Sequence, residues 1–268
     1  KTYYSFRYGT FSTEALVNTA AEAGIHTLAL TNINNTYDCW EFVKLCRQKN
    51  IKPVIGAEIR NENRLLYLLI AKNNNGLKWI HDFLSEHLID KKDFPCRFDT
   101  TPCEDIFIIY PPGIKPAVDL LMNERIGIRF SKLHLLEQYG YKGRENRFVV
   151  MQPVTFQNKI YHALHRLLRC IDKNILLSHL LPEDQADADE LFYPPGQLLE
   201  KFKLYPDLVL NTYKLLDECS IEMTFHSDKT KNTYGGSPTD DKILLEKLAL
   251  DGFRQRYGSK NKIAVERL

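Results

Sequence analysis

A polar turn and one glutamate, each following a short apolar run, are the residues best placed to do chemistry. The turn, TNINN, occupies residues 31–35 after the apolar run 28–30, and Glu58 follows the run 53–56. With the amphipathic segment between them, these pieces predict a β-turn-α-β unit, in which ligands and catalytic groups lie at the carboxyl ends of the strands. The turn carries no titratable side chain, so the first of the two strand ends is chemically poor.

The histidines and cysteines show no pattern typical of a metal site. The six cysteines include no CxxC pair and have no histidine at zinc-finger spacing, so we expect reduced, mostly buried thiols. The eight histidines share no spacing with carboxylates. His162 and His165 are the best remaining pair, and Arg166 and Arg169 beside them favour a solvated basic face. No glycine-rich nucleotide-binding loop of the GxGxxG or GxxxxGK[ST] kind occurs.

The elements that must position these residues alternate between strand and helix over the first 90 residues, which is typical of an α/β fold and favours a barrel over a dinucleotide-binding sheet. The expected strands are residues 27–30, 51–59, 64–71, 106–110, 126–130, 148–151 and 175–181. The expected helices are residues 13–23 with Ser12 as N-cap, 40–49, 77–88, 115–122, 158–171, 197–202, 207–219 and 240–256 with Thr239 as N-cap. In the helix at 158–171 we expect a core stripe of Ile160, Tyr161, Leu164, Leu167 and Leu168.

Length and charge limit the possible functions. The 268 residues can bury a large core in one domain with a smaller appendage, and strands end before a polar, glycine-bearing segment at residues 226–238. We therefore predict a domain at 1–225 and a second region at 226–268. No apolar run is long enough to span a membrane, and no signal peptide is visible, so the chain is expected in the cytoplasm. The net charge of +2 does not by itself indicate nucleic-acid binding.

Four stretches resemble the amino-terminal region of the bacterial DNA polymerase III alpha subunit, in the C-family of DNA polymerases. They are TYYSFRYGT at 2–10, TNINN at 31–35, WEFVKLCRQKNIKPVIGAE at 40–58 and LLEKLALDGFRQRYG at 244–258. The resemblance covers nearly the whole chain and is weak between 90 and 190. It implies a PHP (polymerase and histidinol phosphatase) domain, a distorted seven-stranded β/α barrel, followed by a small helical extension and the start of the polymerase palm.

The resemblance also implies which positions would hold metal. Active PHP members bind metals at the barrel mouth through histidines and carboxylates, a ligand set suited to hydrolysis. The second histidine of the family's opening HxHS motif falls at Lys1. The family's Thr-Asp-His-Gly-Asn turn has Asn32 and Ile33 in place of aspartate and histidine. Glu58 is kept, and the histidine of the next strand falls at or near Leu66.

Two later family motifs are also missing. A Glu-x-x-x-His pair falls on Met151 and Thr155, and an Asn-Asp-x-His motif falls around residues 179–182 without being reproduced. One carboxylate cannot hold a metal cluster, so we expect no metal, no catalytic residue and no cofactor in this region. Lys1 could instead reach Glu58 and replace the charge of the metal, which would leave the carboxylate paired.

For the whole protein, the resemblance implies a nucleotidyltransferase, a DNA-directed DNA polymerase acting on DNA and dNTPs with magnesium held by palm aspartates outside this chain. The resemblance leaves replication and translesion repair open as the role of the whole protein, and this region would brace the palm and thumb. Phosphate contacts are expected for Arg254, Arg256, Lys260 and Lys262, although a charged helix end explains them equally well.

Two other functions stay open from the sequence. The chain could be a stand-alone PHP phosphoesterase with an unusual ligand set. It could also be an interaction module that binds another replication or repair protein through residues 183–225.

Overall fold

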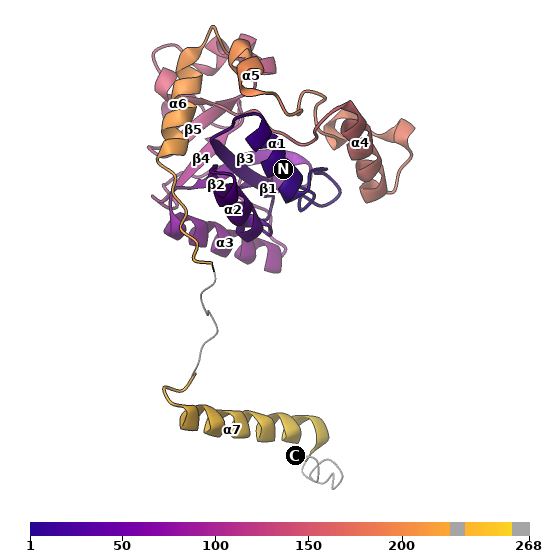
Figure 1. The fold of residues 1–268 in the computed structure, drawn as a ribbon, viewed down its shortest axis with the longest axis vertical. Coiled ribbons are helices and arrows are strands. Elements are labelled where there is room, and N and C mark those ends of the chain that lie inside the picture. The colour runs from indigo at the N-terminus through magenta and orange to yellow at the C-terminus, as the bar shows by residue number, and fades with distance from the viewer. Residues whose placement is uncertain (226–233, 259–268) are drawn as a thin grey trace. The chain divides into compact units, whose positions relative to one another are not determined.

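In a computed structural model of the protein, residues 1–225 and 234–258 are described, and the chain divides into two units, Lys1–Met223 and Thr224–Leu268. The larger unit contains one curled, mixed sheet of six strands in the order β1-β2-β3-β4-β5-β6 (Figure 1). The strands are β1 Thr27–Ile33, β2 Lys52–Asn61, β3 Arg64–Ala71, β4 Ile106–Tyr110, β5 Glu124–Ile128 and β6 Phe148–Val150.

Parallel pairs at the two sides of the sheet enclose an antiparallel centre. β1 and β2 are parallel, as are β4, β5 and β6, whereas β3 is antiparallel to both of its neighbours. The turn between β2 and β3 is short, so these strands form a hairpin, while the parallel neighbours need crossovers. The sheet curls into a half-barrel whose free edges are β1 and β6.

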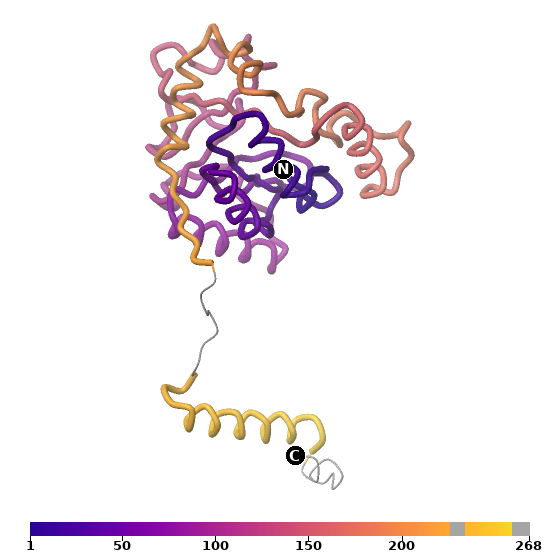
Figure 2. Tube along the Cα trace, in the orientation of Figure 1, coloured from indigo at the N-terminus to yellow at the C-terminus, as the bar shows by residue number. Residues whose placement is uncertain are grey.

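Helices pack on this sheet and continue the chain after it. The α-helices are α1 Thr13–Glu22, α2 Cys39–Gln48, α3 Asn74–Ile89, α4 Lys159–Lys173, α5 Pro195–Lys201, α6 Pro206–Asp217 and α7 Pro238–Tyr257. Short 3-10 turns are η1 Ala117–Asp119, η2 Phe130–Leu135, η3 Glu137–Tyr139, η4 Glu145–Arg147, η5 Leu177–His179 and η6 Pro182–Asp184. α2, α3 and α6 pack against β2, β3 and β6. The Cα trace in Figure 2 shows the chain leaving the sheet after β6 to form α4.

Several local predictions are confirmed. The Ser12 hydroxyl caps α1 by accepting a hydrogen bond from the Ala15 amide. All six cysteines are free, but only Cys46, Cys170 and Cys219 are buried. The continuous apolar run of β3 is largely buried, as expected for a strand covered on both faces. The cap of α7 lies two residues earlier than expected: Ser237, not Thr239, accepts the amide of Asp240, because Pro238 occupies the first helical position.

The expected strand at residues 175–181 is wrong. This segment contains the turn η5, and its side chains Leu176 and Leu181 are exposed by 69% and 53%. Asn174 ends α4 in the left-handed conformation and turns the chain away from the sheet, so these apolar residues have no strand to pair with. The described residues therefore form six strands and not seven. The expected helix at 115–122 is also wrong, because Pro116 restricts the residue before it and only η1 forms.

The stripe of α4 that we expected to face the core faces outward instead. Ile160, Leu164 and Leu167 are exposed by 78%, 41% and 49%, whereas the helix buries His165 and Arg169. The expected solvated basic face is therefore the buried face. The periodicity predicted the helix correctly, but it did not predict which face of the helix is buried against the rest of the unit.

The one helix described in the smaller unit is α7, none of whose side chains is buried. Arg254 and Arg256 lie in its last turn, and the guanidinium of Arg254 is 3.5 Å from the Asp251 carboxylate. Residues 226–233 of the expected linker lie outside the described residues, as do Lys260 and Lys262.

Candidate functional site: a buried ion-pair cluster at the end of the sheet

The carboxyl ends of β1 and β2 bring Glu58 into contact with Lys1. The Lys1 Nζ atom lies 2.9 Å from Glu58 Oε2, and both side chains are almost fully buried. The Lys1 backbone nitrogen donates to the Val154 carbonyl at 2.7 Å, which anchors the residue. The ion pair that we expected between Lys1 and Glu58 is therefore present.

A second cation also pairs with Glu58. Arg60 lies two residues further along β2, on the same face of the strand, and its Nε atom donates to Glu58 Oε1 at 2.6 Å. Its guanidinium also stacks over the ring of Tyr8 at 4.6 Å and donates to the Tyr8 hydroxyl. Glu58 thus has a different cation on each oxygen.

Glu190, from the acidic segment after η6, completes the cluster. Its Oε2 atom lies 3.5 Å from Lys1 Nζ, and its Oε1 atom lies 3.4 Å from Arg129. The hydroxyl of Thr155 donates to the same carboxylate. Arg129 also pairs with Asp187 at 2.7 Å. Sequence reasoning missed Glu190 and Arg129; the only signal was the acidic character of residues 183–190.

The charges in this cluster hold one another in the ionised state. Burial by itself would raise the pKa of Glu58, but Arg60 and Lys1 outweigh it and leave that pKa below its ordinary value. The same competition, with Lys1 and Arg129 as the cations, lowers the pKa of Glu190 to about 2. Burial opposes the charge of the Lys1 ammonium, yet Glu190 and Glu58 raise its pKa. Two carboxylates and their cations thus form a paired unit.

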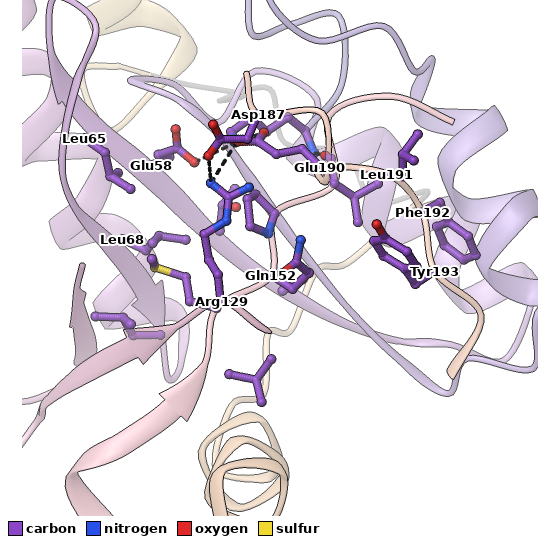
Figure 3. Close-up of a pocket in the computed structure, with 18 of the residues that line it drawn as sticks. Glu58, Leu65, Leu68, Arg129, Gln152, Asp187, Glu190, Leu191, Phe192 and Tyr193 are labelled. Carbon is purple, nitrogen blue, oxygen red and sulfur yellow. Dashed lines mark hydrogen bonds and ion pairs between the residues drawn. The ribbon is translucent and has the colours of Figure 1, made fainter. Parts of the chain in front are cut away.

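The charged side chains of the cluster line a cavity of about 540 Å³. Figure 3 shows Glu58, Arg129 and Glu190 together, with Leu65 and Leu68 on one side and Leu191, Phe192 and Tyr193 on the other. The lining combines apolar side chains with polar residues outside the cluster, among them Asn63, Gln152 and Thr212.

The other positions implied by the family resemblance are scattered. Ile33 is paired in register with Glu58 across β1 and β2 and packs beside Tyr8. Asn32, one residue earlier, belongs to a separate network. Leu66 is buried in β3, where its neighbours Leu65 and Leu68 line the cavity. The family positions in the first half of the chain are Lys1, Asn32, Ile33, Glu58 and Leu66. Of these, the structure brings together Lys1, Ile33 and Glu58.

Of the later family positions, Thr155 contacts the cluster directly, and Met151 and Pro182 line the cavity. His179 lies in the exposed turn η5.

The side chains of the cluster do not fit a metal centre. A cation bound between Glu58 and Glu190 would have to displace the Lys1 ammonium from both carboxylates. Imidazole and thiolate ligands do not supplement them: across residues 1–225 and 234–258, no group of three His, Cys, Asp or Glu side chains could hold a metal ion. Glu58 and Glu190 are instead each paired with two cations of the protein itself.

Asn32 is held by a buried hydrogen-bond network of its own. Its Oδ1 atom accepts from the Thr2 amide at 2.8 Å and from the Ser5 hydroxyl at 3.0 Å, and its Nδ2 group donates to Asp38 Oδ1 at 2.7 Å. The other Asp38 oxygen accepts from Thr2 and Thr13 hydroxyls. The amide is needed here because Asp38 accepts its N–H group.

Replacing Asn32 with aspartate is therefore expected to destabilise the protein by about 2–4 kcal/mol at pH 7, because two buried carboxylates would meet without a proton between them. Urea unfolding at pH 7 and pH 5 measures this, and the loss should shrink at pH 5 as the pair gains a proton. Asn75→Asp, on the exposed start of α3, is the control and should change the stability by less than about 0.5 kcal/mol. An equal effect of both substitutions would contradict the role of Asn32.

Tyr8 links the cluster to α4. The centre of its ring lies 4.6 Å from the guanidinium group of Arg60 and 5.3 Å from that of Arg169, and the ring meets that of His165 edge-on at 4.6 Å. The His165 Nε2 atom accepts the amide of Ala186 at 2.8 Å, so its Nδ1 atom donates to the Tyr8 carbonyl at 2.7 Å. His165 is thus a neutral, structural histidine.

The pH dependence of stability should report this histidine. Burial lowers the pKa of His165 to about 4 from 6.5, so between these values the unfolded chain binds a proton that the folded chain does not. Its contribution is present above pH 6.5 and is lost as the pH falls toward 4. From pH 7 to pH 5 we expect the free energy of unfolding to fall about 2 kcal/mol more in the wild type than in His165→Gln. Parallel pH curves for the two proteins in urea titrations would disprove this assignment.

Comparison with known proteins agrees with the expected family. Residues 1–120 match the PHP domain. Relatives of most of the chain are DNA polymerase III alpha subunits. The chain is 24% identical over 286 residues to that of Halalkalibacterium halodurans, covering 91% of the chain and 24% of the relative. It is 24% identical over 274 residues to that of Ureaplasma parvum, covering 99% of the chain and 26% of the relative.

A third alpha subunit, from Bacillus subtilis, is 22% identical over 302 residues, with 99% of the chain and 26% of the relative covered. The chain thus spans about a quarter of the length of these curated relatives. The PHP match contains β1 to β4 and the residues Lys1, Glu58 and Arg60, whereas Arg129 and Glu190 lie beyond it. Within the described residues, no helix is both long and apolar enough to cross a membrane.

Proposed function

We propose that this chain is the amino-terminal PHP region of a bacterial DNA polymerase III alpha subunit and that its role there is structural. The PHP match and the coverage of the chain by alpha-subunit relatives support this assignment. The parent protein would synthesise DNA from dNTPs in the cytoplasm, in replication or translesion repair, with magnesium held by aspartates outside this chain. The PHP region would brace the palm and thumb.

The position of the Lys1 ammonium carries the proposal that the region is metal-free and inactive. Nζ lies 2.9 Å from Glu58 and 3.5 Å from Glu190, where it supplies the positive charge that a metal ion would otherwise supply. A protonated lysine cannot coordinate or activate water as a Lewis acid does. The region would therefore keep a charge-balanced site without hydrolytic chemistry. Closure of the sheet by a seventh strand stays a prediction.

Metal analysis of the purified protein tests this proposal. After incubation with excess zinc, manganese or iron and gel filtration, we expect less than about 0.1 metal ion per chain, because binding must break buried ion pairs. Hydrolysis of p-nitrophenyl phosphate should equal that of the Glu58→Ala variant. Stoichiometric metal together with phosphoesterase activity that Glu58→Ala abolishes would overturn the proposal in favour of a stand-alone phosphoesterase.

DNA contact by the end of α7 is the remaining part of the proposal. Arg254 and Arg256 are exposed in its last turn and would neutralise DNA phosphates together with Lys260 and Lys262. The pairing of Arg254 with Asp251 at 3.5 Å on an exposed surface is weak and would not prevent this.

A further inference from the structure

The helix α4 presents its apolar face outward. Ile160, Leu164, Leu167 and Ile171 are spaced so that they fall on one side of the helix, and they are exposed by 78%, 41%, 49% and 64%. A helix on the surface of a globular protein normally turns such a stripe toward its core. In Figure 1, α4 lies at one side of the larger unit, apart from α3 and α6.

The opposite face of α4 prevents the helix from rotating to bury this stripe. His165 bridges the Tyr8 carbonyl and the Ala186 amide, and Arg169 donates to the Asp184 carbonyl at 2.7 Å and to Asn63 Oδ1 at 2.9 Å. Rotating α4 would break these buried hydrogen bonds and leave their partners unsatisfied. The inverted orientation is therefore fixed by the packing of the larger unit.

The segment after α4 enlarges the exposed surface. η5 packs against α4, and Leu176, Leu177 and Leu181 around it are exposed by 69%, 43% and 53%. We call these three residues and the four of the α4 stripe the outer face. Seven large apolar side chains at these exposures present on the order of several hundred Å², at or above the largest apolar patch of a typical monomer. Such a patch marks an interaction surface.

The charges beside the outer face select its partner. Lys159 and Arg166 are seven residues apart and flank the stripe on one side, and neither has an ion-pair partner within the described part of the chain. A second copy of α4 packed on the stripe would add further lysine and arginine to this basic flank. An amphipathic helix with carboxylates on its flank would bury the stripe and pair both charges.

We propose that the outer face docks an acidic amphipathic helix from the part of the same polypeptide that follows this region. This inference rests on the proposed function: the polymerase relatives are about four times as long as the part that this chain matches, so most of their length lies outside it. Docking within one chain occurs at a high effective concentration, so a modest interface suffices. The outer face would then be one of the contacts through which the PHP region braces the polymerase.

Cysteine labelling compares the present chain with the full-length polypeptide. Leu164→Cys places a thiol in the outer face, and Leu204→Cys and Ile89→Cys place controls at sites exposed by 79% and 78% elsewhere. Maleimide modification is followed peptide by peptide, with the exposed Cys96 as internal reference. We expect the Leu164→Cys thiol to react at least about tenfold more slowly in the full-length protein than in the 268-residue chain, and at least one control to keep its rate.

A stability measurement separates docking from a local effect. Leu164→Asp should lower the Tm of the full-length protein by several degrees while leaving that of the 268-residue chain unchanged, and Leu204→Asp should lower neither. DNA polymerase activity of the full-length protein tests the proposed function independently. An active polymerase with unchanged labelling at position 164 would overturn the docking proposal alone. Slow labelling in the isolated chain, with a dimer in sedimentation, would overturn it in favour of self-association.

Discussion

Replacing Lys1 with methionine is expected to destabilise the protein by about 3 kcal/mol at pH 7, because it leaves Glu58 and Glu190 buried with one cation fewer between them. Each carboxylate keeps one partner, Arg60 or Arg129, which places the loss at the low end for a broken buried pair. Urea unfolding of the wild type and the variant measures the loss. The pKa of Glu190 should rise from about 2 toward its ordinary value, because Lys1 is the strongest of the charges that lower it.

The matched control is Lys78→Met. Lys78 pairs with Asp82 at 2.6 Å, but its side chain is 76% exposed, so water already screens the pair and we expect a loss below about 0.5 kcal/mol. If both lysine variants changed the free energy of unfolding equally, the cluster around Lys1 would be an incidental contact. Metal binding gained by the Lys1→Met variant would show instead that the ammonium is what excludes a cation.

Gly56→Ala is expected to lower the free energy of unfolding by a similar amount, although Gly56 has no side chain that takes part in the cluster. Gly56 lies in β2 two residues before Glu58, and a Cβ atom added there would come within 2.1 Å of the Leu69 backbone oxygen. Because the contacted atom is a backbone oxygen and the position of a Cβ atom is fixed by its own backbone, no rotamer change relieves the contact, and β2 and β3 must move apart. We expect a loss of about 3 kcal/mol in urea unfolding and weaker pairing of Glu58 with Lys1.

Gly196→Ala is the control for this substitution. Gly196 lies in α5, and an added Cβ atom would meet no other atom within 4 Å. Alanine favours helix over glycine, so this variant should be neutral or slightly more stable. A neutral Gly56→Ala variant would mean that β2 and β3 are not packed as closely as the structure has them.

Much of the fold follows from local patterns. Ser12 caps α1, the apolar run of β3 forms a buried strand, and the β1-turn-α2-β2 unit forms where alternation of apolar and polar segments predicts it. These features depend on side chains close together in the sequence, through capping and periodicity. The strand expected at 175–181 does not form, because an apolar run does not reveal whether a sheet edge is available to pair with it. The helix expected at 115–122 is limited to η1 by Pro116.

The candidate site was predictable in part. The resemblance to a family with metal ligands at Lys1 and Glu58 led to the expected ion pair, which the structure contains at 2.9 Å. Arg129 and Glu190 reach the same cluster from segments more than 60 residues after Glu58. No local spacing links them to it, because their meeting depends on how the segments after β5 and β6 cross the end of the sheet.

The sequence by itself indicated an α/β protein that resembles PHP domains, with Glu58 in a buried strand and no titratable side chain at residues 31–35. Only the tertiary structure decided that Glu190 shares Lys1 with Glu58 and that α4 turns His165 and Arg169 inward and its leucines outward. The physical reason is the same for both. Periodicity records which side chains share a face, whereas the direction of that face depends on buried hydrogen bonds and ion pairs between distant segments.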